Sequence, residues 1–177
     1  SDYQEIMKEF GTMEDMDLLI KECKKMDIKI MMDLVMNHTS DEHPWFIESS
    51  SSKDNPKREY YIWKEGKDGN PPNNWESYFE DLAWTLDEKT GEYYLHHFSK
   101  RQPDLNWSNK EVREEMYRIV EWWIEKGIDA LRLDAIHHIG KPEGLPDALR
   151  DDGWGKLNYR NTDETHEYLQ ELYQRVM

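Results

Sequence analysis

The sequence has one cysteine, little positive charge and no long apolar run. Because Cys23 has no second cysteine to pair with, an internal disulfide and a zinc site built on cysteines are both excluded. The apolar runs are far shorter than the ~20 residues that cross a bilayer, so we expect no membrane span. Only 23 Lys and Arg oppose 38 Asp and Glu, and the net charge of -15 disfavours nucleic acid and anionic lipid as partners.

The sequence also shows no leader and no initiator methionine, since it begins Ser1-Asp-Tyr. We therefore favour a cytoplasmic location, and a targeting segment upstream of Ser1 stays open. Core material is present in quantity, because 37% of the residues are hydrophobic and 12% are aromatic. These fractions are typical of one globular domain of ordinary size.

Apolar spacing predicts three helices and two strands. The helices are expected over 13–26, 109–126 and 163–176. The short apolar runs 28–35 and 128–133 predict strands, and the composition of the first is typical of a strand covered on both faces. This order is typical of an α/β protein with parallel strands.

Capping signals support the first two helices. Thr12 with Asp15, and Ser108 with Glu111, match the capping-box spacing. Gly127 stands where a glycine ends a helix in the left-handed conformation.

Residues 39–107 interrupt the regular strand-to-helix link. A loop of that length inside a compact domain is usually a small subdomain of its own or a functional segment, and we favour the subdomain. Residues 84–98 predict a hairpin with its turn at Asp87 to Gly91. His96 and His97 occupy adjacent hairpin positions that face opposite sides, so a metal ion shared by the two is not expected.

The aromatic residues of this insert fit two interpretations, a small core or platforms on which sugars stack. We expect four of the six in the core and Phe79 to approach a pocket. The six are Trp45, Tyr60, Tyr61, Trp63, Trp75 and Phe79.

The predicted strands end in polar residues that suit a catalytic site. Functional groups of parallel α/β proteins collect at the carboxyl ends of strands. Arg132 and Asp134 share side-chain parity, and a guanidinium favours an ionised carboxylate, as a nucleophile requires. Taken alone, the pair also fits the rim of a core, and Asn37-His38 also fits an ordinary loop turn.

Three motifs in order carry a resemblance to a known family. They are Asp33-x-Val-x-Asn37-His38, Gln102-Pro-Asp-Leu-Asn-Trp107 and Gly127-Ile-Asp-Ala-Leu-Arg-Leu-Asp134-Ala. The sequence resembles the α-amylase superfamily, glycoside hydrolase family 13, and within it the oligo-1,6-glucosidase and α-glucosidase branch. The resemblance runs over essentially the whole chain.

The resemblance implies an α/β fold, a segment of a (β/α)8 barrel with an inserted small α+β subdomain. Residues 1–38 and 108–177 would belong to the barrel, and 39–107 would form the inserted subdomain. A full barrel needs ~250 residues, so the chain looks like an internal fragment.

The resemblance also assigns roles in a retaining reaction on an α-glucosidic bond. Asp134 matches the nucleophile that forms a covalent glucosyl-enzyme, Arg132 the arginine that orients it, and His38 a histidine that binds a sugar hydroxyl. Asp33 and Asn37 match structural positions that tie the strand end to the insert. His138 matches a histidine that several amylases place near the substrate.

The same resemblance also predicts which glycosidic linkage is preferred and which catalytic groups lie outside the chain. Ala135, a small residue after the nucleophile, favours short α-1,4-linked substrates over α-1,6-linked ones, by no more than ~1 to 3 kcal/mol per methylene. The general acid, expected to be a glutamate, and a calcium-binding loop of many relatives would lie outside the chain, so the chain alone is expected to be inactive and to need no cofactor. Exposed strand edges would pair with the rest of the barrel or with another copy.

Three alternatives stay open. One is a metal-dependent hydrolase that uses Asp33, His38, Asp134 and His137, although the HxH spacing of such sites is absent. A non-catalytic carbohydrate-binding fragment and a relative that transfers or isomerises glucosyl groups are the others.

Overall fold

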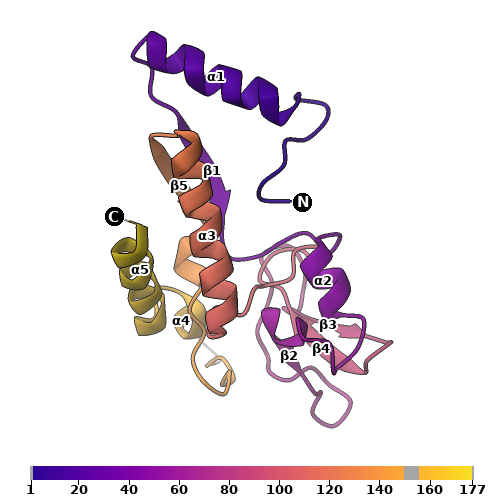
Figure 1. Cartoon of the computed structure of the whole chain (residues 1–177). Helices are drawn as coiled ribbons and strands as arrows, with labels where there is room; N and C mark the ends of the chain where they lie inside the picture. The colour runs from indigo at the N-terminus through magenta and orange to yellow at the C-terminus, as the bar shows by residue number, and fades with distance from the viewer. Residues whose placement is uncertain (1, 150–155, 177) are drawn as a thin grey trace.

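The structure is a computed structural model that describes residues 2–149 and 156–176 (Figure 1). The segments on either side of the insert form three longer helices and a pair of parallel strands. The insert, residues 39–107, holds a short helix and three short strands. In chain order the elements are α1 (Met13–Lys25), β1 (Met31–Val35), α2 (Pro44–Ser49), β2 (Trp63–Lys64), β3 (Trp84–Asp87), β4 (Glu92–Leu95), α3 (Lys110–Lys126), β5 (Ala130–Asp134), α4 (Lys156–Tyr159) and α5 (Asp163–Val176). The three predicted helices are confirmed to within one residue at each end.

The predicted N-terminal cap is correct for α1 and misplaced for α3. The capping box of Thr12 and Asp15 at α1 is confirmed, with both reciprocal bonds formed. At α3 the expected cap at Ser108 is wrong by one residue, because the Asn109 side chain accepts from the Glu111 backbone N–H at 2.9 Å. Gly127 ends α3 in the left-handed region, with φ 107, as predicted.

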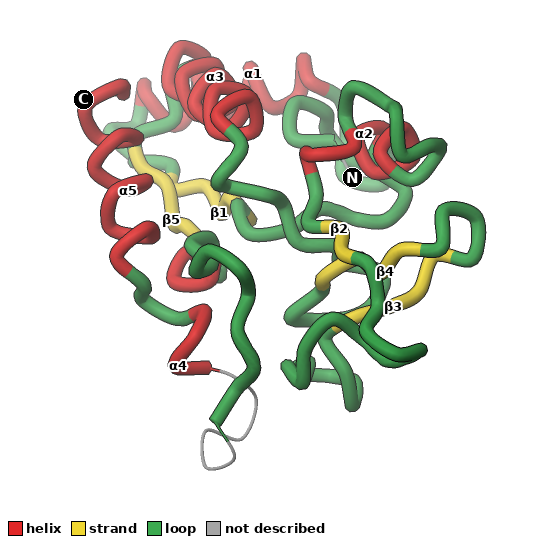
Figure 2. Tube along the Cα trace, turned by 90° about the horizontal axis from the view of Figure 1, so that it is seen from below, coloured by secondary structure: helices red, strands yellow, loops and turns green. Residues whose placement is uncertain are grey.

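β1 and β5 pair in parallel, with Asp33 opposite Arg132 and Val35 opposite Asp134. α3 crosses one face of this pair and α5 lies beside it (Figures 1 and 2). The expectation that the first strand is covered on both faces is wrong for the described residues, since Met31 is 67% exposed. Both strands also begin two or three residues later than expected. Before β1, the Ile28 N–H still bonds to the Cys23 carbonyl at the end of α1.

The insert forms an antiparallel sheet of its own, in the order β2-β4-β3. The predicted hairpin is confirmed as β3 and β4, and Gly91 closes its turn with a backbone bond to Asp87. One core joins the insert to α3 and β1, and a smaller core lies inside the insert against Tyr159.

The aromatic residues of the insert are more deeply packed than expected. Tyr60, Tyr61 and Trp75 are buried, and Trp45 and Trp63 are partly buried against the first core, so five of the six pack inward. Phe79 is 71% exposed. In the part of the chain that the structure describes, no helix is long and apolar enough to cross a membrane.

Candidate active site

A guanidinium bridges two carboxylates where the parallel strands end. Arg132 Nη1 donates to Asp33 Oδ2 at 2.6 Å, and Arg132 Nη2 donates to Asp134 Oδ1 at 2.7 Å. The strand register explains the arrangement, because Asp33 lies opposite Arg132 and all three side chains share one face of the pair. The hydrogen bond to Asp134 and the charge of Asp33 raise the pKa of Arg132 above its ordinary value.

This geometry corrects the role expected of Asp33. Its carboxylate pairs with Arg132 on the neighbouring strand, and the structure shows no bond from it to the insert in the described residues. The link from the strand end to the insert is made instead by Asn37, whose Nδ2 donates to Asp104 Oδ1 at 3.0 Å and whose carbonyl accepts from Leu105 N.

The backbone turns sharply after Asp134. Ala135 adopts φ 51 and ψ 21, in the left-handed region, and a single turn of 3-10 helix, Ile136–His138, follows. The strand therefore ends with the Asp134 side chain at its mouth, while the chain that follows leaves the sheet.

His38 lies at the mouth of the neighbouring strand and is 8% exposed. It lines an open cleft of about 860 Å³ together with Asp33, Val35 and Gln102. Burial lowers the pKa of His38 below its ordinary value. The charge of Lys141 acts in the same direction, and those of Asp104 and Asp134 oppose it. The side chain is therefore neutral at pH 7.

Behind His38 lies a buried ionic cluster that the sequence did not predict. The carboxylate of Asp104 is fully buried and accepts from Lys141 Nζ at 2.9 Å and from His97 Nδ1 at 2.5 Å. Lys141 also donates to Asn37 Oδ1 at 2.9 Å, so the loop after β5, the end of β1 and the insert meet at one point.

The charges of this cluster are set by Asp104 and Lys141. Burial alone would raise the pKa of Asp104, but the charge of Lys141 and the hydrogen bonds from His97 and Lys141 outweigh it and hold that pKa well below its usual range. Burial lowers the pKa of Lys141 and of His97, and Asp104 opposes both shifts. The cluster is thus an ion pair of Asp104 and Lys141 with a neutral His97 donating to it.

His138 lies inside a group of packed rings and is 1% exposed. Its Nε2 is 3.1 Å from the Tyr78 hydroxyl, and its ring stacks on Tyr159 with centroids 5.4 Å apart. Burial lowers its pKa to about 2. The structure places this side chain behind the strand mouth and not on the cleft, so its role beside a substrate stays a prediction.

Phe79 is connected to the site through one other ring. Its ring centroid lies 6.0 Å from that of Phe98, which lies 5.0 Å from that of His38. Its exposure leaves it free to meet a ligand, and contact with a substrate stays a prediction.

The histidines of the hairpin face different partners, as expected. His96 Nε2 contacts Thr85 Oγ1 at 2.8 Å, whereas His97 bonds to Asp104. Among residues 2–149 and 156–176, no three His, Cys, Asp or Glu side chains converge as a metal ion requires.

Known proteins resemble this chain in sequence and in fold. The model of the α-amylase catalytic domain matches residues 1–177. The oligo-1,6-glucosidase of Parageobacillus thermoglucosidasius is 54% identical over 181 residues, which cover 100% of this chain and 32% of that protein. The trehalose-6-phosphate hydrolase of Bacillus licheniformis superposes with a TM-score of 0.96 at 47% identity, covering 99% of this chain and 32% of that one. The isomaltulose synthase of Erwinia rhapontici gives a TM-score of 0.92 at 45% identity, with the same coverage.

The chain belongs to the α-amylase family of glycoside hydrolases. It spans about a third of the length of the relatives that it matches. Its parallel strands, with α3 and α5 beside them, are therefore a segment of a (β/α)8 barrel, which confirms the expected fold class.

Proposed function

We propose that this chain carries the nucleophile of a retaining α-glucosidase that acts on terminal α-glucosyl residues of short oligosaccharides. The observation that supports this most is the carboxylate of Asp134, which Arg132 holds at the end of β5, beside the end of β1 that leads to His38. The names of relatives, oligo-1,6-glucosidase among them, agree with the substrate class.

In the proposed reaction an oxygen of Asp134 attacks the anomeric carbon of the sugar. The bond from that carbon to the glycosidic oxygen breaks, and the leaving oxygen takes a proton from a carboxylic acid. Water then attacks the anomeric carbon of the glucosyl ester. It gives a proton to the group that protonated the leaving oxygen, which is now a carboxylate, and glucose is released with its configuration retained. Asp134 regains its charge in the second step.

Arg132 and His38 support this step in different ways. Two guanidinium nitrogens hold Asp33 and Asp134, so Arg132 fixes the rotamer of the attacking carboxylate. The imidazole of His38 is neutral, so it adds no charge to the cleft that it lines, and its contact with the sugar is part of the proposal. Phe79 is proposed to contact the sugar ring through its exposed face.

The second carboxyl group is proposed to lie outside this chain. A retaining enzyme needs a nucleophile and an acid ~5 to 5.5 Å apart on the two sides of the bond. Of the carboxylates described here, Asp33 is held by the same guanidinium as Asp134. We therefore expect no turnover of p-nitrophenyl α-glucoside by the isolated chain, and turnover comparable to that of an intact relative would contradict this expectation.

For linkage we propose a preference for α-1,4 over α-1,6 bonds, because the side chain that follows Asp134 is only a methyl group. Ala135→Val adds two methyl groups there and is expected to move the ratio of maltose to isomaltose turnover toward isomaltose by roughly tenfold. Faster turnover of isomaltose than of maltose by the unsubstituted protein would contradict the proposal. This comparison comes first, because several relatives are named oligo-1,6-glucosidases.

The decisive experiment uses the whole polypeptide that carries this sequence. Incubation with p-nitrophenyl α-glucoside, followed by NMR, should show that glucose is first released as the α-anomer, before mutarotation. Asp134→Asn should remove turnover and leave maltose binding within a few fold, whereas Asp17→Asn on the exposed face of α1 should change neither. Release of β-glucose would overturn the retaining mechanism.

A second candidate is a relative that isomerises or transfers glucosyl groups. The similarity to isomaltulose synthase favours it specifically. Product analysis separates the two functions, since a transferring enzyme yields new disaccharides where a hydrolase yields free glucose. Retained turnover in Asp134→Asn would exclude both, and sugar binding without turnover in the unsubstituted polypeptide would leave a carbohydrate-binding protein.

A further inference from the structure

The side chain of Gln102 contacts the ring of His38 in the wall of the cleft that both residues line. Its Oε1 accepts from the backbone N–H of Ser99 at 3.2 Å, and because that group can only donate, the orientation of the amide is fixed. Gln102 Nε2 therefore points at His38, with 3.1 Å between the two Nε2 atoms. An amide nitrogen of this kind can only donate to the imidazole.

A second amide faces the other ring nitrogen. Asn37 Oδ1 accepts from Lys141 Nζ, and Asn37 Nδ2 donates to the Asp104 carboxylate, which again fixes the amide orientation. The remaining hydrogen of Asn37 Nδ2 faces His38 Nδ1 at 3.3 Å.

Donors on both sides restrict the protonation state of His38. A neutral imidazole has one lone pair and can accept from one of the two amides. An imidazolium has two N–H groups and would face a donor at each, which leaves both without an acceptor. The amides of Gln102 and Asn37 thus oppose protonation, in addition to burial.

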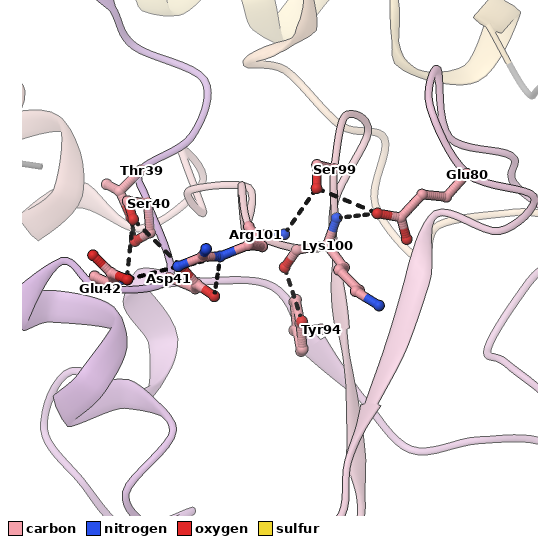
Figure 3. Close-up of polar contacts among 9 residues, drawn as sticks. All are labelled: Thr39, Ser40, Asp41, Glu42, Glu80, Tyr94, Ser99, Lys100 and Arg101. Carbon is pink, nitrogen blue, oxygen red and sulfur yellow. Dashed lines mark hydrogen bonds and ion pairs between the residues drawn. The ribbon is translucent and has the colours of Figure 1, made fainter.

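The segment that carries Gln102 is held in place on both sides (Figure 3). Arg101 donates to the carboxylates of Asp41 and Glu42 on one side. On the other side, Glu80 accepts from the backbone N–H of Lys100 at 2.9 Å and from the Ser99 hydroxyl at 3.3 Å. The Tyr94 hydroxyl also donates to the Lys100 carbonyl at 2.9 Å.

We propose that Gln102 is a positioning residue whose amide keeps His38 neutral and fixes its ring at the mouth of the strand. The segment at 99–102 acts as a clamp that presents this amide. The contribution to sugar binding rests on the proposed function, whereas the effect on His38 does not, because it arises from contacts within the free protein.

The test is an NMR titration of His38 in the ligand-free protein with Gln102→Glu as the principal variant. The substitution keeps the shape of the side chain and replaces a donor by an acceptor that carries charge. A carboxylate this close to an imidazole should raise the pKa of His38 by about one to three units relative to the unsubstituted protein. The other charges near His38, on Asp104, Asp134 and Lys141, are the same in both proteins.

Gln170→Glu, on the exposed surface of α5, is the matched control because it adds the same charge far from His38. Arg101→Ala loosens the clamp without placing a charge beside the ring, and it should move the pKa less than Gln102→Glu does. A shift in Gln102→Glu no larger than in Gln170→Glu would overturn the proposal. Because no sugar is present, this result is independent of turnover by the whole polypeptide, so failure of the positioning role and failure of the glucosidase assignment are distinguished.

Discussion

Removing the charge of Asp104 should destabilise the chain more than any surface change of the same kind. Asp104→Asn keeps the shape of the side chain but leaves the Lys141 ammonium, whose side chain is 5% exposed, without its counter-charge. Breaking a buried ion pair in this way costs about 3 to 5 kcal/mol. For a chain of this length that corresponds to a fall in Tm on the order of 6 to 20 °C.

The assay is urea denaturation followed by tryptophan fluorescence, with Glu115→Gln as the control. Glu115 pairs with Arg118 at 2.8 Å on the surface of α3, and loss of that pair should cost less than about 0.5 kcal/mol. The double variant Asp104→Asn with Lys141→Met should be more stable than the sum of the single losses predicts, because the unpaired charge is gone.

The pH dependence gives an independent check on Asp104. Because its folded pKa lies below that of the unfolded chain, its stabilising contribution is complete above pH ~4 and is lost as the pH falls below that value. The difference between the two proteins should therefore shrink below pH ~4. A loss in Asp104→Asn equal to that in Glu115→Gln, with additive behaviour in the double variant, would refute the reasoning.

Three further predictions concern other parts of the chain. Gly127→Ala should destabilise by about 1 to 2 kcal/mol in thermal melts, since a Cβ would sit at positive φ, 3.2 Å from Ile20 Cγ2, and an unchanged Tm would contradict this. Burial lowers the pKa of His43 to about 4, so the stability that this residue contributes is complete above pH ~6.5 and is lost as the pH falls toward 4. His43→Asn keeps an N-cap for α2 but does not titrate in this window. The free energy of unfolding should therefore depend less on pH between 6.5 and 4 in this variant. The isolated chain should self-associate through the free edges of β1 and β5, which sedimentation would show as a mass above 21.4 kDa, and a strictly monomeric chain at high concentration would count against it.

Sequence reasoning succeeded where the determinants are local. Helices α1, α3 and α5 follow from apolar residues at helical spacing, and the pairing of Arg132 with Asp134 follows from parity within one strand. The start of α3 was misplaced because Ser108 and Asn109 are both good capping residues, and only the folded backbone shows that the Ser108 hydroxyl bonds to Asn106.

Long-range contacts were missed for a physical reason. The buried cluster draws Asn37, His97, Asp104 and Lys141 from three separate segments, and no spacing in the sequence connects a lysine after β5 with a carboxylate in the insert. Lys141 is ordinary in its local sequence, and its burial follows from the way the loop after β5 folds against the insert. The Gln102 contact with His38 was also missed, although both belong to motifs that the sequence shows.

Covalent trapping tests the central claim most directly. The whole polypeptide would be incubated with a slow fluorinated α-glucosyl fluoride, digested and analysed by mass spectrometry. The account predicts one glucosyl adduct, located on Asp134, and none in Asp134→Asn. An adduct on another carboxylate, or steady turnover of maltose by Asp134→Asn, would contradict it.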